Sequence, residues 1–161
     1  MPMVDEQDMK ILKELKKDSR LTTRQIAKKT KISSATVHRR INHLIKDGVI
    51  KQFTIEPDWK KLGVKTVAYV MLNTDTEYIK KKGLTQDTIA DNLKKHHSIV
   101  TCNTITGTKD IILKVRLKDT EDLHDFINWL RNQEGVIQTE TAVVLHEASK
   151  PSNLLDGSDF G

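Results

Sequence analysis

The apolar residues of this chain change their spacing once, near residue 60, and the change divides the sequence into two folding patterns. Up to about residue 46 they recur every three to four positions, as on the buried stripe of an amphipathic helix. From residue 66 onward, alternating apolar stretches are interleaved with helical spacing, as in a domain that mixes strands and helices. We therefore expect two domains of the α+β class.

The N-terminal domain, expected over residues 1–58, has the pattern of three short helices. An apolar stripe predicts the first over residues 5–17. Ser33 is the predicted N-cap of the third, which should end at Asp47-Gly48. Because only a tight turn separates the last two, the pattern predicts a helix-turn-helix. The apolar pairs at 49–50 and 53–55 predict a two-stranded wing behind it.

Basic side chains are concentrated in the first part of the chain. Residues 1–60 carry 14 Lys and Arg against 8 Asp and Glu, whereas residues 61–161 carry 13 against 14. The N-terminal domain is therefore expected to bind a polyanion, with a solvated lysine-rich surface as the alternative.

The third predicted helix has a face suited to reading double-stranded DNA. Val37, Ile41 and Leu44 share the side that packs against the other helices, so the opposite side is exposed. Arginine can pair with guanine, and threonine can touch the thymine methyl group. The predicted DNA contacts are Ser34, Thr36 and Arg39 near base edges, Arg40, His43 and Lys46 at phosphates, and Lys28 and Lys31 beside the backbone.

The second domain is expected over residues 66–147, after a linker at 59–65 and before a flexible tail at 148–161. Its predicted elements are a strand at 66–74, a helix within 79–97, strands at 99–106 and 110–117, a helix at 120–133 and a strand at 136–145. The order βαββαβ is that of the ferredoxin-like fold.

The first of these strands is apolar at both odd and even positions, from Val67 to Leu72. Such a strand is expected to be buried on both faces, and two helices can cover only one of them. A partner sheet would cover the other, which predicts a homodimer or a larger assembly.

Several function classes find no support in the sequence. Cys102 is the only cysteine and is expected in the core, so no cysteine-based metal cage can form. No catalytic or metal-binding motif is recognisable, and we predict neither enzyme activity nor a cofactor. No apolar run approaches the roughly 20 residues that span a membrane. A cytoplasmic protein without membrane contact is expected.

In order and spacing, these elements resemble the Lrp/AsnC (leucine-responsive, or feast/famine) transcription regulators. The resemblance extends from Asp5 to about Glu147 and implies a dimer paired through its sheets, able to form tetramers or octamers, with an amino-acid effector. The motifs that carry it are Asp5-x-x-Asp8-x-x-Ile11-Leu12, Ser33-x-x-Thr36-Val37-x-x-Arg40-Ile41-x-x-Leu44, Gly48-Val49-Ile50, Thr106-Gly107-x-x-Asp110 and Val136-x-x-Thr139-x-Thr141-x-x-Val144-Leu145.

The resemblance implies an effector site at the interface of two domains, beside the Gly-x-x-Asp turn. Gly107 permits a concave turn whose N–H groups face a carboxylate, and Asp110 could meet an ammonium group. A plain β-turn capped by Asp110 is the alternative. Lys109 stands where the family often has an aromatic residue, so an acidic effector, or none, is also open. The residues expected at this site are Gly107, Thr108 and Asp110, with Thr139 and Thr141 close by.

Two other functions compete with an effector-controlled regulator. One is an architectural DNA-binding protein without an effector, which only its affinity ratio between specific and random DNA would separate from a regulator. The other is an enzyme similar to the haem-pathway decarboxylases, which would need His, Arg and Tyr around a tetrapyrrole. Residues 64–72 contain Tyr69 but no histidine, which disfavours the enzyme.

Overall fold

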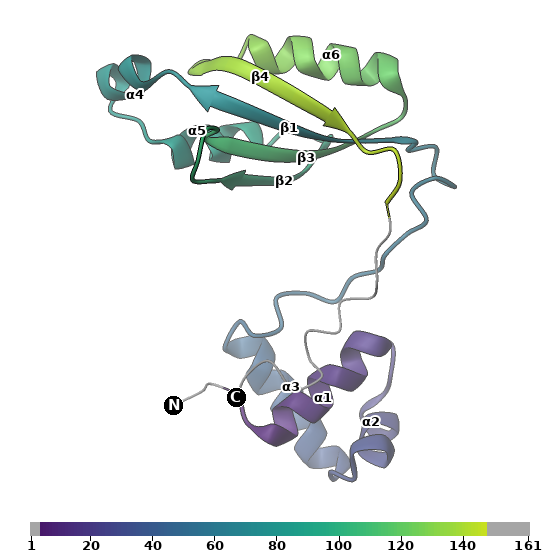
Figure 1. Ribbon diagram of the computed structural model, residues 1–161. Helices are drawn as coiled ribbons and strands as arrows, with labels where there is room; N and C mark the ends of the chain where they lie inside the picture. Colours follow the sequence, from purple (N-terminus) through teal and green to yellow (C-terminus); the bar gives the residue numbers. More distant parts are fainter. Residues whose placement is uncertain (1–3, 148–161) are drawn as a thin grey trace. The chain divides into compact units, whose positions relative to one another are not determined.

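The computed structural model describes residues 4–147, and Figure 1 shows them as two compact units. The boundary between the units lies between Glu56 and Pro57. The tail expected over 148–161 lies outside the described residues.

The N-terminal unit contains the three expected helices, each begun by a side chain that caps it. They are α1 (Glu6–Lys17), α2 (Thr23–Thr30) and α3 (Ser34–Lys46). Asp5 caps α1 and exchanges backbone-to-carboxylate hydrogen bonds with Asp8. Thr22 caps α2, and the Ser33 hydroxyl caps α3 by accepting from the N–H of Thr36. These bonds satisfy N–H groups that have no partner within the helix.

The turn between α2 and α3 depends on one backbone conformation. Lys31 ends α2 with φ 59° and ψ 27°, and it is the only non-glycine residue with positive φ among those described. This left-handed conformation is costly for a residue with a Cβ atom. It reverses the chain so that α2 and α3 pack around a small core of Ile11, Leu15, Ile26 and Val37.

The expected two-stranded wing is not formed: no strand occurs between α3 and residue 66. Ile50 packs back on the helical core, and its N–H donates to the carbonyl of Leu44. Beyond it, the side chains of Phe53 and Ile55 are 51% and 80% exposed. An isolated pair of strands is marginal without a surface to pack on, and this segment buries too little apolar area to provide one.

The second unit is a four-stranded antiparallel sheet with helices on one face. Its elements are β1 (Thr66–Thr74), α4 (Thr76–Lys82), α5 (Gln86–Leu93), β2 (Ile99–Thr104), β3 (Ile111–Leu117), α6 (Thr120–Arg131) and β4 (Val136–Val143). The strand order is β2-β3-β1-β4. This is the ferredoxin-like order, which confirms the predicted fold class.

The helix expected within residues 79–97 is present as α5, and an additional helix, α4, precedes it. Gly83 ends α4 in the left-handed conformation, with φ 64°, and Thr85 caps α5. A glycine in this conformation is a common helix terminator. The helical spacing of the apolar residues does not reveal the break because Ile79 and Ile89 both pack on the same core.

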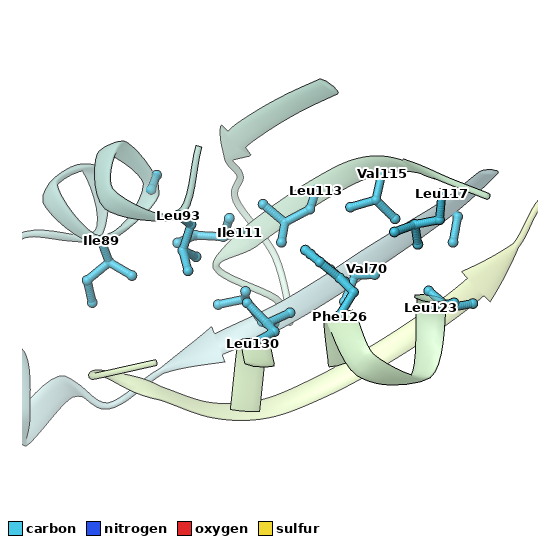
Figure 2. Packing of buried hydrophobic residues seen from close by; sticks show 13 residues of the cluster. Val70, Ile89, Leu93, Ile111, Leu113, Val115, Leu117, Leu123, Phe126 and Leu130 are labelled. Atoms are coloured by element: carbon cyan, nitrogen blue, oxygen red, sulfur yellow. The ribbon is translucent and has the colours of Figure 1, made fainter. Parts of the chain in front are cut away.

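The core of the second unit lies between one sheet face and helices α5 and α6. Figure 2 shows Val70, Leu113 and Val115 of the sheet directed toward Phe126 and Leu130 of α6. All five side chains are at most 2% exposed.

The opposite face of the sheet is not buried within one chain. Along β1, buried residues alternate with partly exposed ones, and Tyr69 is 38% exposed. Within the single chain, Val67 to Leu72 is thus buried on one face only, because all the helices that build the core lie on one side, and burial of the other face by a partner sheet stays a prediction. The open face carries the ion pairs Lys109–Glu140 and Lys114–Glu147.

The segment before β1 packs on the second unit. Residues 58–63 form a helical turn in which the N–H of Val64 donates to the carbonyl of Trp59. The indole ring of Trp59 lies 4.8 Å from the guanidinium carbon of Arg116 on β3, a cation–π contact. Part of the expected linker is thus attached to the sheet.

Candidate DNA interface and effector site

Helix α3 buries one side and exposes the side expected to contact DNA. Val37 and Leu44 are buried, and Ile41 packs against the same core. Arg39, His43 and Lys46 are exposed on the other side. Within residues 4–147, Arg39 makes no ion pair or side-chain hydrogen bond, so its guanidinium is available to a ligand.

Hydroxyl groups fix the first turn of α3. The Ser33 hydroxyl donates to the Thr36 hydroxyl at 2.8 Å, and the Ser34 hydroxyl donates to that of Thr23 at 3.3 Å. The second contact places the N-termini of α2 and α3 side by side. Two helix N-termini present N–H groups and positive dipole ends that favour phosphate.

Thr23 and the neighbouring Arg24 were not among the residues expected to contact DNA. Arg24 is exposed in the first turn of α2 and has no side-chain partner within the described chain. The helix-turn-helix pattern could have indicated both, because it brings the start of α2 next to the start of α3.

Arg40 does not belong to this exposed face. Its Nη1 donates to Oδ2 of Asp5 at 2.7 Å and to Oδ1 of Asp8 at 2.9 Å. These carboxylates raise the pKa of Arg40, Asp8 contributing most. The guanidinium thus links α3 to the start of α1, and two carboxylates already bind the Nη1 of this expected phosphate contact.

The lysines of α2 and the turn differ in their surroundings. Lys29 pairs with Glu14 on α1, with Nζ 3.1 Å from Oε2. Lys28 and Lys31 are exposed and make no ion pair in the part of the chain that the structure describes. These two therefore keep their charge available to a ligand. His43 is held by Asp47, with Nδ1 2.9 Å from Oδ2.

The turn expected at the effector site is built into the sheet by its own hydrogen bonds. Gly107 has φ 126° and is exposed. The Thr108 carbonyl accepts from the amide of Asn73 at 2.9 Å. The Asp110 carboxylate accepts from the N–H and hydroxyl of Thr74, at 2.7 and 2.9 Å. Asp110 thus caps the end of β1, which agrees with the alternative of a plain capped turn.

Thr139 and Thr141 lie on β4, on the other side of β1 from this turn. They pair with Leu72 and Val70, whose side chains enter the core. The turn joins β2 and β3, so about two strand spacings, roughly 9–10 Å, separate it from β4. Within one chain the turn and the two threonines thus lie on opposite sides of β1, and Lys109 of the turn reaches Glu140 of β4 at 3.3 Å.

A pocket of about 350 Å³ lies at the corner between α6 and β4. Its lining contains one of the expected residues, Thr139, together with Arg131 at the end of α6. The remaining lining residues are Val136, Ile137 and Gln138.

Two matches to known protein families agree with this geometry. Residues 4–51 match winged helix-turn-helix DNA-binding domains, and residues 68–154 match the Lrp/AsnC ligand binding domain. The chain belongs to the Lrp/AsnC family of transcriptional regulators. It is a regulator with a DNA-binding domain and a ligand-binding domain, and not an enzyme of the decarboxylase type.

Individual Lrp/AsnC relatives match over nearly the full length. An uncharacterized HTH-type transcriptional regulator of Pyrococcus furiosus is 37% identical, covering 88% of this chain and 92% of its own. The HTH-type transcriptional regulator FL11 of Pyrococcus horikoshii is 34% identical, covering 94% and 95%. The structure of LrpC from Bacillus subtilis superimposes with a TM-score of 0.76 at 32% identity, covering 91% and 97%.

No helix in the described part of the chain is long and apolar enough to cross a membrane. Nowhere in residues 4–147 do three His, Cys, Asp or Glu side chains gather as a metal site would require.

Proposed function

We propose that this Lrp/AsnC chain regulates transcription by binding specific DNA sequences, as a dimer or larger assembly whose affinity responds to a small effector. The exposed face of α3 carries the proposal. Arg39 is unpaired on it, and the hydroxyls of Ser34 and Thr36 are held in fixed positions at the N-terminus. This is the end of a recognition helix that contacts base edges. A regulator of this kind is proposed to act in the cytoplasm.

Selection of bound fragments from random DNA would yield the preferred site. Arg39→Ala should then weaken binding to that site by about 1–3 kcal/mol, and binding to random DNA by less. Arg20→Ala is a matched control, because Arg20 is also exposed but precedes the helix-turn-helix. Equal losses on both DNAs would make Arg39 a phosphate contact instead.

The architectural alternative differs in its ratio of affinities. A regulator should bind its preferred site about 10³-fold or more tightly than random DNA at physiological salt. A protein that compacts DNA would bind both nearly equally. Competition of the selected fragment with a scrambled one measures this ratio directly.

The open face of the sheet supports the proposed dimer. Val67, Tyr69 and Met71 of β1 point away from the helices and are only partly covered. A second copy of the sheet would bury them. Sedimentation at micromolar concentration should give a dimer or larger species, and Tyr69→Glu should weaken it, whereas Lys118→Glu should not. A monomeric wild type would contradict the proposal.

An amino acid or related effector is proposed for the second unit. The turn containing Gly107, Thr108 and Asp110 and the threonines Thr139 and Thr141 lie on opposite sides of β1 in one chain, and the proposed place of the site is the interface between two copies of the second unit. Calorimetry against the twenty amino acids tests it. A hit should weaken with Thr141→Val, and with Asp110→Asn if the turn participates. Absence of heat from all twenty would leave a regulator without an amino-acid effector.

A further inference from the structure

The pocket at the α6–β4 corner has the size of a site for a small metabolite. Its volume of about 350 Å³ lies near the lower end of the roughly 300–1,000 Å³ usual for small-molecule sites. Its lining combines one cation, one hydroxyl, one amide and two apolar side chains. Arg131 is the only charged member, so the ligand's charge should be set by that residue.

Arg131 is oriented but not neutralised. Its Nε donates to the Thr139 hydroxyl at 3.2 Å, which holds the guanidinium beside β4. No carboxylate lies within ion-pair distance of it among residues 4–147. The carboxylates nearest to it in the sequence bind other partners. Glu134 accepts a hydrogen bond from the Tyr78 hydroxyl, and Glu140 pairs with Lys109. The Nη groups therefore remain free for an anion.

A bulge in β4 shapes the apolar part of the pocket. Gln138 pairs with Asn73 and Val136 pairs with Thr74, which leaves Ile137 as an extra residue without a partner on β1. A bulge changes the direction of the side chain it carries. Ile137 is 63% exposed although it is a large apolar residue. A ligand that covered it would remove this apolar surface from water.

We propose that this corner binds a small organic acid, with a carboxylate on the Arg131 guanidinium and an apolar carbon chain against Ile137 and Val136. The planar fork of arginine matches a carboxylate with two parallel hydrogen bonds. The inference rests on the proposed function in one respect, that the bound acid acts as the effector. In this proposal Arg131 binds the carboxylate of an acidic effector, because the ammonium group of Lys109 is already paired with Glu140.

Calorimetry of the full chain with glutarate tests the pocket, with glutaramide as the uncharged analogue. Glutarate should bind and glutaramide should not. Arg131→Gln should lower glutarate affinity at least about tenfold, Arg131→Lys less, and Thr139→Val by a smaller factor, because only one positioning bond is lost. Lys118→Gln, an exposed cation of the same unit, should leave binding unchanged.

Two results would overturn the proposal that this pocket binds an organic acid. One is no heat from glutarate, 2-oxoglutarate or glutamate at up to about 10 mM, where a dissociation constant near 1 mM would be detected. The other is binding that Arg131→Gln leaves intact. Circular dichroism of the variant must match the wild type, which is expected because Arg131 is exposed.

The DNA affinity, measured with and without glutarate, separates the pocket from its effector role. If glutarate binds through Arg131 and changes DNA affinity, both inferences are supported. If it binds but DNA affinity is constant, the pocket stands and the effector role is overturned. If none of glutarate, 2-oxoglutarate and glutamate binds while Arg39-dependent DNA binding persists, the pocket is overturned and DNA recognition stands.

Discussion

Nη1 of Arg40, on α3, lies 2.9 Å from Oδ1 of Asp8, on α1. Asp8 and Asp5 form the capping box of α1, so one guanidinium binds both carboxylates that begin that helix. The contact joins the first and third helices at their polar edge, where the apolar core does not extend. A residue expected at DNA phosphates is thus a structural cross-link.

Arg40→Met should destabilise the N-terminal unit by about 1–3 kcal/mol, because charge-assisted hydrogen bonds are lost and the Asp8 carboxylate, only 13% exposed, is left without its cation. Urea unfolding of wild type and variant measures the difference. The Asp8 N–H and Arg40 lower the pKa of Asp5. This stabilisation is therefore present above the ordinary pKa of 3.8 and is lost as the pH falls below it. A difference that grew on acidification would contradict this account.

Lys31→Gly should stabilise the chain by about 1 kcal/mol, because glycine adopts a φ of 59° without strain. Lys28→Gly is the matched control. It removes the same charge from within α2 and should cost about 1 kcal/mol of helix stability. Both should weaken DNA binding to a similar extent if both lysines meet the backbone. Thermal melting with DNA titration distinguishes the conformational effect from the charge effect.

Gly135→Ala should destabilise the second unit by about 2–4 kcal/mol, through both backbone strain and overpacking. Gly135 has φ +80°, and an added Cβ would lie 2.7 Å from Cδ1 of Ile89. Gly107→Ala isolates the strain, since φ there is +126° and nothing lies within 4 Å. Its loss should be about 1–2 kcal/mol. Ile89→Val removes the clashing methyl group and should recover part of the Gly135→Ala loss in a double-mutant cycle.

DNA affinity should fall steeply with salt, with a log-log slope of about −5 to −9 if roughly 6–10 phosphates are neutralised per dimer. Lys46→Ala should reduce the magnitude of the slope by about 2, because the dimer loses two cations, one from the exposed side of each α3. Lys29→Ala should change the slope less, since Lys29 is already paired with Glu14. Filter binding over a range of salt concentrations gives both slopes. Identical slopes for the two variants would count against the proposed interface.

Cys102 should react slowly with thiol reagents in the native protein. Burial raises its pKa to about 11, so little thiolate forms at neutral pH. Relative to an exposed thiol, the reaction at pH 8 should be about 10- to 100-fold slower and should accelerate on unfolding in urea. The native rate should increase with pH up to about 11. A fast native reaction at pH 7 would show that Cys102 is accessible and not part of the core edge.

Local signals in the sequence predicted the N-terminal helices well. A capping side chain such as Ser33 acts within one turn, so its effect can be inferred from adjacent residues. Lys31 could be located in the turn but not assigned its left-handed conformation, which depends on how α2 and α3 pack. The role of Arg40 was missed for the same reason, because residues 5 and 8 approach it only in the folded unit.

In the second unit, too, the contacts between distant residues could not be inferred from the local sequence. Alternation predicted the strands and their order along the chain, but that order alone does not fix which threonines face the helices. The register Thr139 to Leu72 settles this, and it separates Thr139 from the turn at Asp110. The bulge at Ile137 has no local signature, since it results from a register shift between β1 and β4.

All the residues that line the α6–β4 pocket fall between positions 131 and 139. Substitutions in this short stretch can therefore change which ligand the pocket binds, without altering α3 or the side chains that cap it. Divergent copies of such a gene could acquire new inducers while keeping the same operators. For engineering, one synthetic DNA fragment that covers these codons would allow all the lining residues to be varied together.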